Sequence, residues 1–182
     1  MKKLITLLLV MMMLFIACKT PEARKPISVK TGSFIDKSVE RNKKLNKIEH
    51  DRILHIISDN PNNKYLNSKN GFWYYYNTKI ENDTITPKFG DLVNFNYNIK
   101  DLNGTIIYNT KELKARNYAI DQEELFSGLR EGLKLMKAGE TVTFIFPSQK
   151  AYGYYGDTKR IGANTPIICR VTINTITQKE TN

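Results

Sequence analysis

Apolar residues recur at helical spacing in an early part of the chain. Within residues 39–58 they fall near a 3.6-residue period, with polar residues between them: Leu45, Ile48, Ile53, Ile56 and Ile57. This spacing predicts an amphipathic helix. The helix should end at Asp59-Asn60-Pro61, because proline lacks the backbone N–H of the helical ladder and clashes with the preceding turn.

The pattern changes to alternation after Gly71. Four segments are rich in β-branched and aromatic residues at a period of two: FWYYYNTKI, GDLVNFNYNIKDLNGTIIYN, ETVTFIFPSQ and TPIICRVTINTI. Each segment is typical of a strand with one buried face. Together they predict an antiparallel sheet in the C-terminal two thirds of the chain.

One helical pattern interrupts these strands, in DQEELFSGLREGLKLMKAG. Its apolar residues lie on one face of a helix, at Leu125, Leu129, Leu133 and Met136, and Gly139 stands where a C-cap glycine is expected. A single short helix among several strands predicts an α+β fold, with the helix lying across a curved antiparallel sheet.

The N-terminus has the pattern of an export signal. Two lysines precede an apolar run from Leu4 to Ala17, which is short for a membrane span. Ala17 and Cys18 then resemble the bacterial lipobox, in which the cysteine is acylated and becomes the mature N-terminus. We expect a signal peptide over residues 1–17, lipid on Cys18 and a flexible tether over residues 18–38, where Pro21 and Pro26 disfavour regular structure.

The chain contains two cysteines. A lipid on Cys18 would leave Cys169 without a disulfide partner, and a Cys18–Cys169 bridge is the competing interpretation. Cys169 lies in an alternating strand pattern, which favours a small buried hydrophobic residue.

His50 and His55 are five residues apart, not the four that would place two metal ligands on one helical face, so no metal site is expected.

The formal net charge is +10. A basic balance of this size is found in nucleic-acid-binding proteins, but an export signal argues against that partner. A solvated basic face near an anionic membrane surface is the simpler interpretation.

The segment LFSGLREGLKLMKAGETVTFIFPSQKAYG resembles the FKBP-type peptidyl-prolyl isomerases. GDLVNFNY with Asn103-Gly104-Thr105 is similar to an early strand and hairpin of that family, and IGAN with TPIICRVTI is similar to its closing loop and last strand. The resemblance covers about Ser68 to Thr177 and implies an isomerase domain over residues 68–178. The helical segment predicted from the apolar spacing, assigned to residues 39–67, precedes this domain, and a tail over residues 179–182 follows it. Combined with a lipid anchor, this domain is similar to the FKBP-type lipoproteins associated with gliding motility in flavobacteria.

The resemblance implies an FKBP-like curved antiparallel sheet wrapped around one short helix, and catalysis of cis–trans isomerisation at X–Pro bonds. This reaction needs no cofactor and no metal, because rotation about the amide breaks resonance and no covalent bond. The implied partners are proline-containing exported polypeptides, with the lipid anchor in the cell envelope facing the periplasm and no role for nucleic acid.

The resemblance also assigns residues. Tyr97, Phe126 and Tyr152 are implied as the catalytic set: Tyr97 on a pocket wall, the Phe126 N–H and the Tyr152 hydroxyl as donors to substrate carbonyls. The remaining implied substrate contacts are Ile107, Tyr108, Tyr118, Leu125, Leu129, Ile161 and Cys169. Without the resemblance, most of these residues would be read as ordinary core, whereas Tyr152 in a glycine-flanked loop favours function.

Several positions depart from the family pattern. Tyr108 replaces an aspartate that normally sits against the pocket, Arg116 a frequent aromatic residue, and Leu129 a frequent tryptophan. Activity could therefore be reduced, which leaves two alternatives: a catalytically weak proline-binding chaperone or assembly module, and a purely structural lipoprotein with a filled core. Asp83-Thr84-Ile85 also resembles an O-glycosylation signal of Bacteroidetes, although an ordinary loop threonine is the simpler interpretation.

Overall fold

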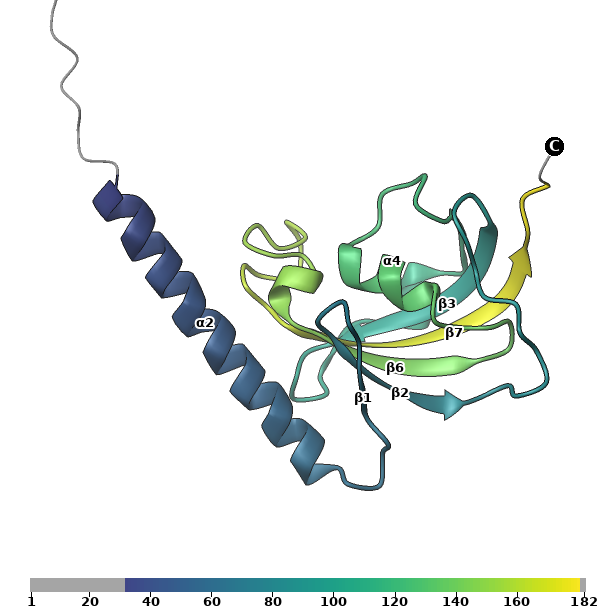
Figure 1. Ribbon diagram of the computed structural model, residues 1–182, viewed down its shortest axis with the longest axis horizontal. Helices are drawn as coiled ribbons and strands as arrows, with labels where there is room; N and C mark the ends of the chain where they lie inside the picture. The colour runs from purple at the N-terminus through teal and green to yellow at the C-terminus, as the bar shows by residue number, and fades with distance from the viewer. Residues whose placement is uncertain (1–31, 181–182) are drawn as a thin grey trace, which may run out of the picture. The chain divides into compact units, whose positions relative to one another are not determined.

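The computed structural model describes residues 32–180, and the predicted signal peptide, Cys18 and most of the predicted tether lie outside them. The first element is the helix α2 (Gly32–Asp59), which Figure 1 shows preceding the strands. The chain divides into two units, residues 1–39 and residues 40–182. In residues 32–180 no helix combines the length and apolar character needed to cross a bilayer.

The helix α2 begins earlier than the sequence analysis predicts. It starts at Gly32 instead of Val39, so residues 32–38 are helical and do not belong to a flexible tether. No proline stands between Pro26 and Pro61, and a helix formed around the apolar residues can therefore extend toward its N-terminus one hydrogen bond at a time. It ends at Asp59, directly before Asn60-Pro61, where its end is predicted.

A seven-stranded antiparallel sheet follows. Its order is β1-β2-β6-β7-β3-β4, and β5 also pairs with β3. The strands are β1 (Leu66–Asn67), β2 (Trp73–Thr78), β3 (Leu92–Lys100), β4 (Ile106–Tyr108), β5 (Arg116–Ala119), β6 (Thr141–Phe146) and β7 (Ile167–Thr177). The helical segments between them are α3 (Thr110–Leu113), α4 (Ser127–Leu133) and the 3₁₀ helix η2 (Ser148–Lys150). The predicted α+β class is confirmed.

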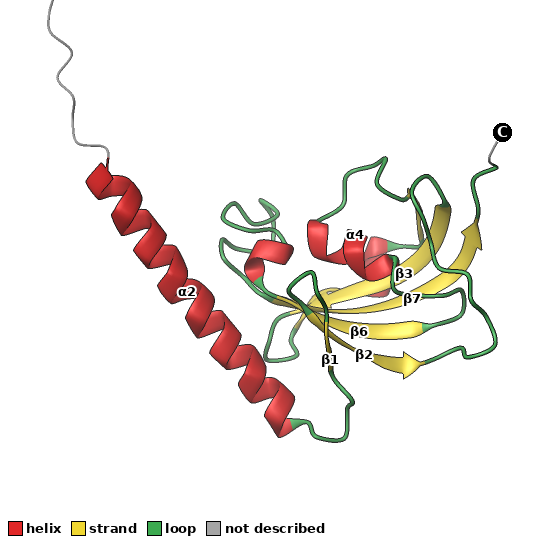
Figure 2. Cartoon of the chain, in the orientation of Figure 1, coloured by secondary structure: helices red, strands yellow, loops and turns green. Residues whose placement is uncertain are grey.

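The main core lies between α4 and one face of the sheet (Figure 2). Alternate residues of the central strands point to this face, including Phe95 and Tyr97 of β3 and Phe144 and Phe146 of β6. Leu129 and Leu133 of α4 and Met136 just after it are fully buried against them. The predicted apolar stripe of the helix is therefore the surface that meets the sheet.

The helix α4 is shorter than predicted. It covers Ser127–Leu133, and Gly139 lies in a turn before β6, with φ +82°, and does not cap the helix. The N–H of Gly139 donates to the carbonyl oxygen of Ile173 at 2.8 Å. This hydrogen bond joins the turn to β7. The conformation of Gly139 is therefore set by a residue distant in sequence, whereas the local pattern predicted a helix C-cap.

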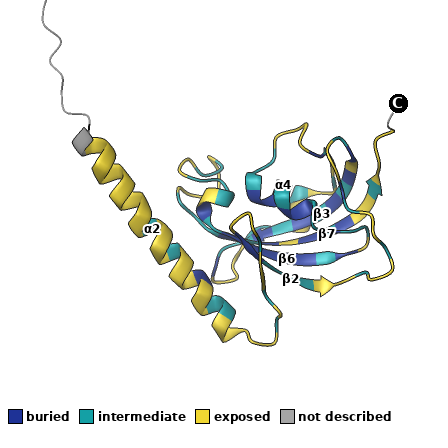
Figure 3. Cartoon of the chain, in the orientation of Figure 1, coloured by how far each residue is buried: buried dark blue, intermediate teal, exposed yellow. Residues whose placement is uncertain are grey.

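The opposite face of the sheet carries a second, smaller core. It contains Ile53 of α2 together with Trp73, Leu102 and Ile145, all buried. Figure 3 shows α2 as mostly exposed, with buried positions confined to its C-terminal part. Trp73 and Ile145 alternate with residues of the main core along β2 and β6, so the same strands support both layers.

The helix α4 approaches β6 closely at its glycines. A Cβ atom built on Gly128 would lie 2.5 Å from Cδ1 of Phe146 and 2.6 Å from the carbonyl oxygen of Lys150. A Cβ on Gly132 would lie 2.9 Å from the ring of Phe144. All three distances are shorter than van der Waals contact, so only glycine allows this packing at either position.

We expect Gly128→Ala to lower the free energy of unfolding by about 1–3 kcal/mol, because the added methyl group overpacks a site bounded partly by backbone. The gain in helix propensity, at most about 1 kcal/mol, does not offset this cost. Gly162→Ala is the matched control, since its Cβ meets only the Thr165 hydroxyl at 3.5 Å. Urea unfolding measures both variants, and equal stability of the two would contradict the packing described for α4.

Candidate functional site

A cavity of about 510 Å³ opens beside α4. Its walls come from β3, β5, the segment before α4, α4 itself and the segment after η2, and the lining residues are Tyr97, Arg116, Glu123, Glu124, Leu125, Phe126, Arg130 and Tyr152. A volume of this order suits a small ligand or a few residues of a peptide. The three residues expected to be catalytic therefore line a single cavity.

Phe126 stands at the centre of the aromatic part of this wall. It is the N-cap of α4, with its ring centroid 5.4 Å from that of Phe146 and 5.1 Å from that of Tyr152. The N-cap position leaves backbone N–H groups without partners inside the helix, as donors for another acceptor. Tyr97 reaches the cavity because alternation along β3 points it toward the α4 side of the sheet.

The hydroxyl groups of Tyr152 and Tyr97 remain protonated at neutral pH. Burial raises the pKa of Tyr152, and the nearby Tyr97 hydroxyl and Cys169 thiol add to the effect. Burial also raises the pKa of Tyr97, although the positive charge of Arg116 opposes this shift. Both tyrosines can therefore donate a hydrogen bond to a carbonyl in the cavity over the physiological pH range.

Charged residues surround the aromatic wall. Arg116 donates from Nη2 to the carbonyl oxygen of Glu124 at 2.8 Å, which ties β5 to the segment before α4. Arg130 forms an ion pair with Asp121, with Nε and Oδ1 3.5 Å apart. The sequence analysis did not predict Glu123, Glu124 or Arg130 in the site. The spacing in the sequence could have indicated Arg130, because Arg130 follows Phe126 by four residues and residues four apart lie on the same face of a helix.

Leu125 lines the cavity as expected, whereas the other six expected substrate contacts are not among its lining residues. Tyr118, Leu129 and Cys169 are fully buried in the main core, and Ile161 is 3% exposed. Ile107 and Tyr108 are half-buried and pack against that core. These residues support the cavity walls, and direct contact of any of them with a substrate remains a prediction.

A carboxylate from a different segment of the chain stands beside Tyr108. The Tyr108 hydroxyl donates to Oδ2 of Asp157, the one carboxylate in the loop of residues 150–164. Oδ1 of Asp157 accepts from the backbone N–H groups of Lys159, Arg160 and Ile161 at 2.9, 2.9 and 2.8 Å. Asp157 thus joins the loop that follows Tyr152 to β4.

Electrostatics stabilise the charged form of Asp157. Partial burial opposes its charge, but the hydrogen bonds from Tyr108 and from the backbone outweigh burial and hold the pKa below its usual range. Arg160 adds a second link between the same two segments. Its guanidinium lies 4.9 Å from the ring centroid of Tyr108 and donates to the carbonyl oxygen of Ile107 at 2.9 Å.

The site can bind and orient a peptide, and nothing in its lining suggests covalent chemistry. Within residues 32–180 no group of three or more His, Cys, Asp or Glu side chains could hold a metal ion. Cys169 is fully buried, and burial raises the pKa of its thiol, so it is a poor nucleophile. Aromatic walls with fixed hydroxyl and N–H donors are suited to holding an amide in one geometry.

Comparison with known proteins agrees with this geometry. The structure resembles a crystal structure of a peptidyl-prolyl cis-trans isomerase from Pseudomonas syringae pv. tomato, with a TM-score of 0.60 and 19% sequence identity over 75% of this chain and 96% of that chain. At that identity the likeness establishes the fold. The sequence model of the FKBP-type peptidyl-prolyl cis-trans isomerases matches residues 83–174, half of the chain and every residue of the cavity wall. The chain therefore belongs to the FKBP-type peptidyl-prolyl cis-trans isomerases.

Proposed function

We propose that this isomerase acts in the cell envelope, anchored by lipid on Cys18 and facing the periplasm, on X–Pro bonds of exported polypeptides. The cavity formed by Tyr97, Phe126 and Tyr152 is the observation that carries the substrate assignment. The anchor rests on the apolar run of residues 4–17 and the Ala17-Cys18 pair. The narrower resemblance to gliding-motility lipoproteins supports components of that machinery as clients.

The chemistry of the reaction fits a site without cofactors. Rotation about an X–Pro amide meets a barrier of about 18–20 kcal/mol, because the twisted amide loses its resonance. The enzyme must bind the twisted amide more strongly than either planar form. A thousandfold acceleration needs about 4 kcal/mol of such differential binding.

The cavity residues have distinct roles in this proposal. The rings of Tyr97, Phe126 and Tyr152 enclose the proline ring and exclude water. The backbone N–H of Phe126 and the hydroxyl of Tyr152 donate to the carbonyl groups that flank the rotating bond. These donors are held in place before substrate arrives, so little ordering is required when the amide twists.

The alternative function is a catalytically weak proline-binding chaperone or assembly module. It is favoured by Tyr108, which takes the place of the pocket aspartate. Asp157 restores a carboxylate beside that position from a different segment of the chain, and it fixes the loop that carries Tyr152. We therefore favour catalysis over binding alone.

The lipid anchor can be tested by metabolic labelling with an alkyne-modified fatty acid in a bacterial host that processes lipoproteins. We expect label on the wild-type chain and none on Cys18→Ser, because acylation requires the thiol. Cys169→Ser is the matched control and keeps its label, since Cys169 is buried in the core. Label that persists in Cys18→Ser, or an unlabelled wild type, would refute the anchor.

We expect Tyr152→Phe to reduce kcat/KM for a proline-containing peptide about tenfold, the effect of losing one hydrogen bond of about 1–1.5 kcal/mol in the transition state. The ring remains, so the cavity and the stability of the fold should be preserved. Tyr154→Phe is the control, because Tyr154 is 63% exposed. A protease-coupled isomerisation assay compares the variants, and full activity of Tyr152→Phe would exclude its hydroxyl as a donor.

We expect Asp157→Asn to lower the melting temperature at pH 7 by about 2–4 °C, since it loses a hydrogen bond worth about 1 kcal/mol. The pKa of Asp157 is lowered in the folded state. Its contribution to stability is therefore present above the ordinary carboxyl pKa of about 4 and is lost as the pH falls through the lower folded pKa.

The difference in melting temperature between wild type and Asp157→Asn should accordingly shrink as the pH falls below about 4. Thermal unfolding followed by circular dichroism at pH 7 and in acid measures it. Asp83→Asn serves as the control, because Asp83 bonds only the backbone N–H of Ile85, two residues away. A difference that is independent of pH would show that the charge of Asp157 does not matter.

A further inference from the structure

A carboxylate of α2 binds the segment that leads into Tyr152. Oε2 of Glu49 accepts from the backbone N–H of Ser148 at 2.9 Å, and Oε1 accepts from the Ser148 hydroxyl at 2.7 Å. The two residues are 99 positions apart in the chain. Ser148 is 2% exposed, so the carboxylate satisfies two buried donors that have little access to water.

Ser148 also holds the residues on both sides of Tyr152. Its carbonyl oxygen accepts from the N–H of Ala151 at 3.0 Å and from the N–H of Gly153 at 2.8 Å. Tyr152 is therefore the residue between two backbone groups that both bind Ser148. A displacement of Ser148 would therefore also displace the Tyr152 ring.

Glu49 is presented by a rigid part of α2. Ile53, one turn later, is fully buried in the second core. Arg52 donates from Nη2 to Oδ1 of Asn103 at 2.7 Å, which fixes the helix to the turn between β3 and β4 as well. The Glu49 carboxylate thus has a defined position before any substrate binds, as a supporting group for a site requires.

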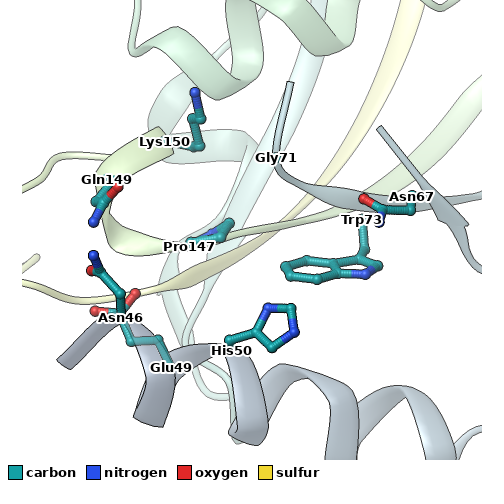
Figure 4. Close-up of a pocket in the computed structure, with 9 residues that line it drawn as sticks. All are labelled: Asn46, Glu49, His50, Asn67, Gly71, Trp73, Pro147, Gln149 and Lys150. Atoms are coloured by element: carbon teal, nitrogen blue, oxygen red, sulfur yellow. The ribbon is translucent and has the colours of Figure 1, made fainter. Parts of the chain in front are cut away.

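The segment around Ser148 has room to move if this link is lost. Figure 4 shows a cavity with Asn46, Glu49 and His50 of α2 on one side and Pro147, Gln149 and Lys150 on the other. Its volume is about 320 Å³. Without the carboxylate, Ser148 would keep two buried donors with no partner, which costs about 1–3 kcal/mol. Movement toward the cavity, where water could replace Glu49, would relieve that cost.

We propose that Glu49 is a positioning residue for isomerisation, which acts through Ser148 to hold Tyr152 against Phe126. This inference rests on the proposed role of the Tyr152 hydroxyl. It makes α2, which precedes the residues matched by the family, part of the working isomerase. The carboxylate does not touch the substrate, and its effect is transmitted by the backbone of residues 148–153.

The test is a double-mutant cycle in the full chain. We expect Glu49→Ala, which removes both acceptors of Ser148, to lower kcat about tenfold with little change in KM, because a misplaced donor weakens binding of the twisted amide more than binding of the planar one. In a Tyr152→Phe background the same substitution should cause little further loss. Asp51→Ala, at an exposed position of the same helix, is the control and keeps wild-type kinetics.

A merely structural role gives a different pattern. Unchanged kcat in Glu49→Ala, or an equal loss with and without the Tyr152 hydroxyl, would overturn the proposal. An inactive wild type would instead count against the proposed function. The position of the loop can still be read in that case, from nuclear Overhauser contacts between the Tyr152 and Phe126 rings. We expect those contacts to weaken in Glu49→Ala, and their full retention would overturn the inference.

Discussion

The packing of α4 on β6 at Gly128 is the constraint on which the functional cavity depends. Without a side chain there, the helix lies directly on the Phe146 ring and on the carbonyl oxygen of Lys150. Phe126 begins the same helix, and Tyr152 follows Lys150 by two residues. One contact therefore sets the separation of the two aromatic residues that form the cavity, whose ring centroids are 5.1 Å apart.

Catalysis of this isomerisation depends more on the positions of the groups in the cavity than on their individual reactivity. Isomerisation needs an apolar enclosure and a few fixed donors, and raised tyrosine pKa values keep the hydroxyl groups in their donating form. Placement depends on two links to the loop that carries Tyr152. Asp157 ties the loop to Tyr108 of β4, and Glu49 ties its beginning to α2. The first link joins two segments that are 49 positions apart in the chain.

The sequence predicted the fold because its signals are local and repeated. Alternation over β3 and β7 and the stripe of α4 correspond to faces that are buried in the structure, whereas β6 is buried on both faces. The cavity residues Tyr97, Phe126 and Tyr152 came from the family resemblance, since composition alone would place aromatic residues in a core. Contacts distant in sequence could not be predicted in this way. The conformation of Gly139 and the link from Glu49 to Ser148 are both of this kind.

The central claim is that the cavity speeds rotation of an X–Pro bond by binding it. NMR exchange spectroscopy of a proline-containing peptide, with the protein at micromolar concentration, tests this most directly. We expect faster exchange between the cis and trans resonances of the peptide, with shift changes in the protein centred on Tyr97, Phe126 and Tyr152. Binding at these residues with exchange at the uncatalysed rate would contradict it and would leave a proline-binding module.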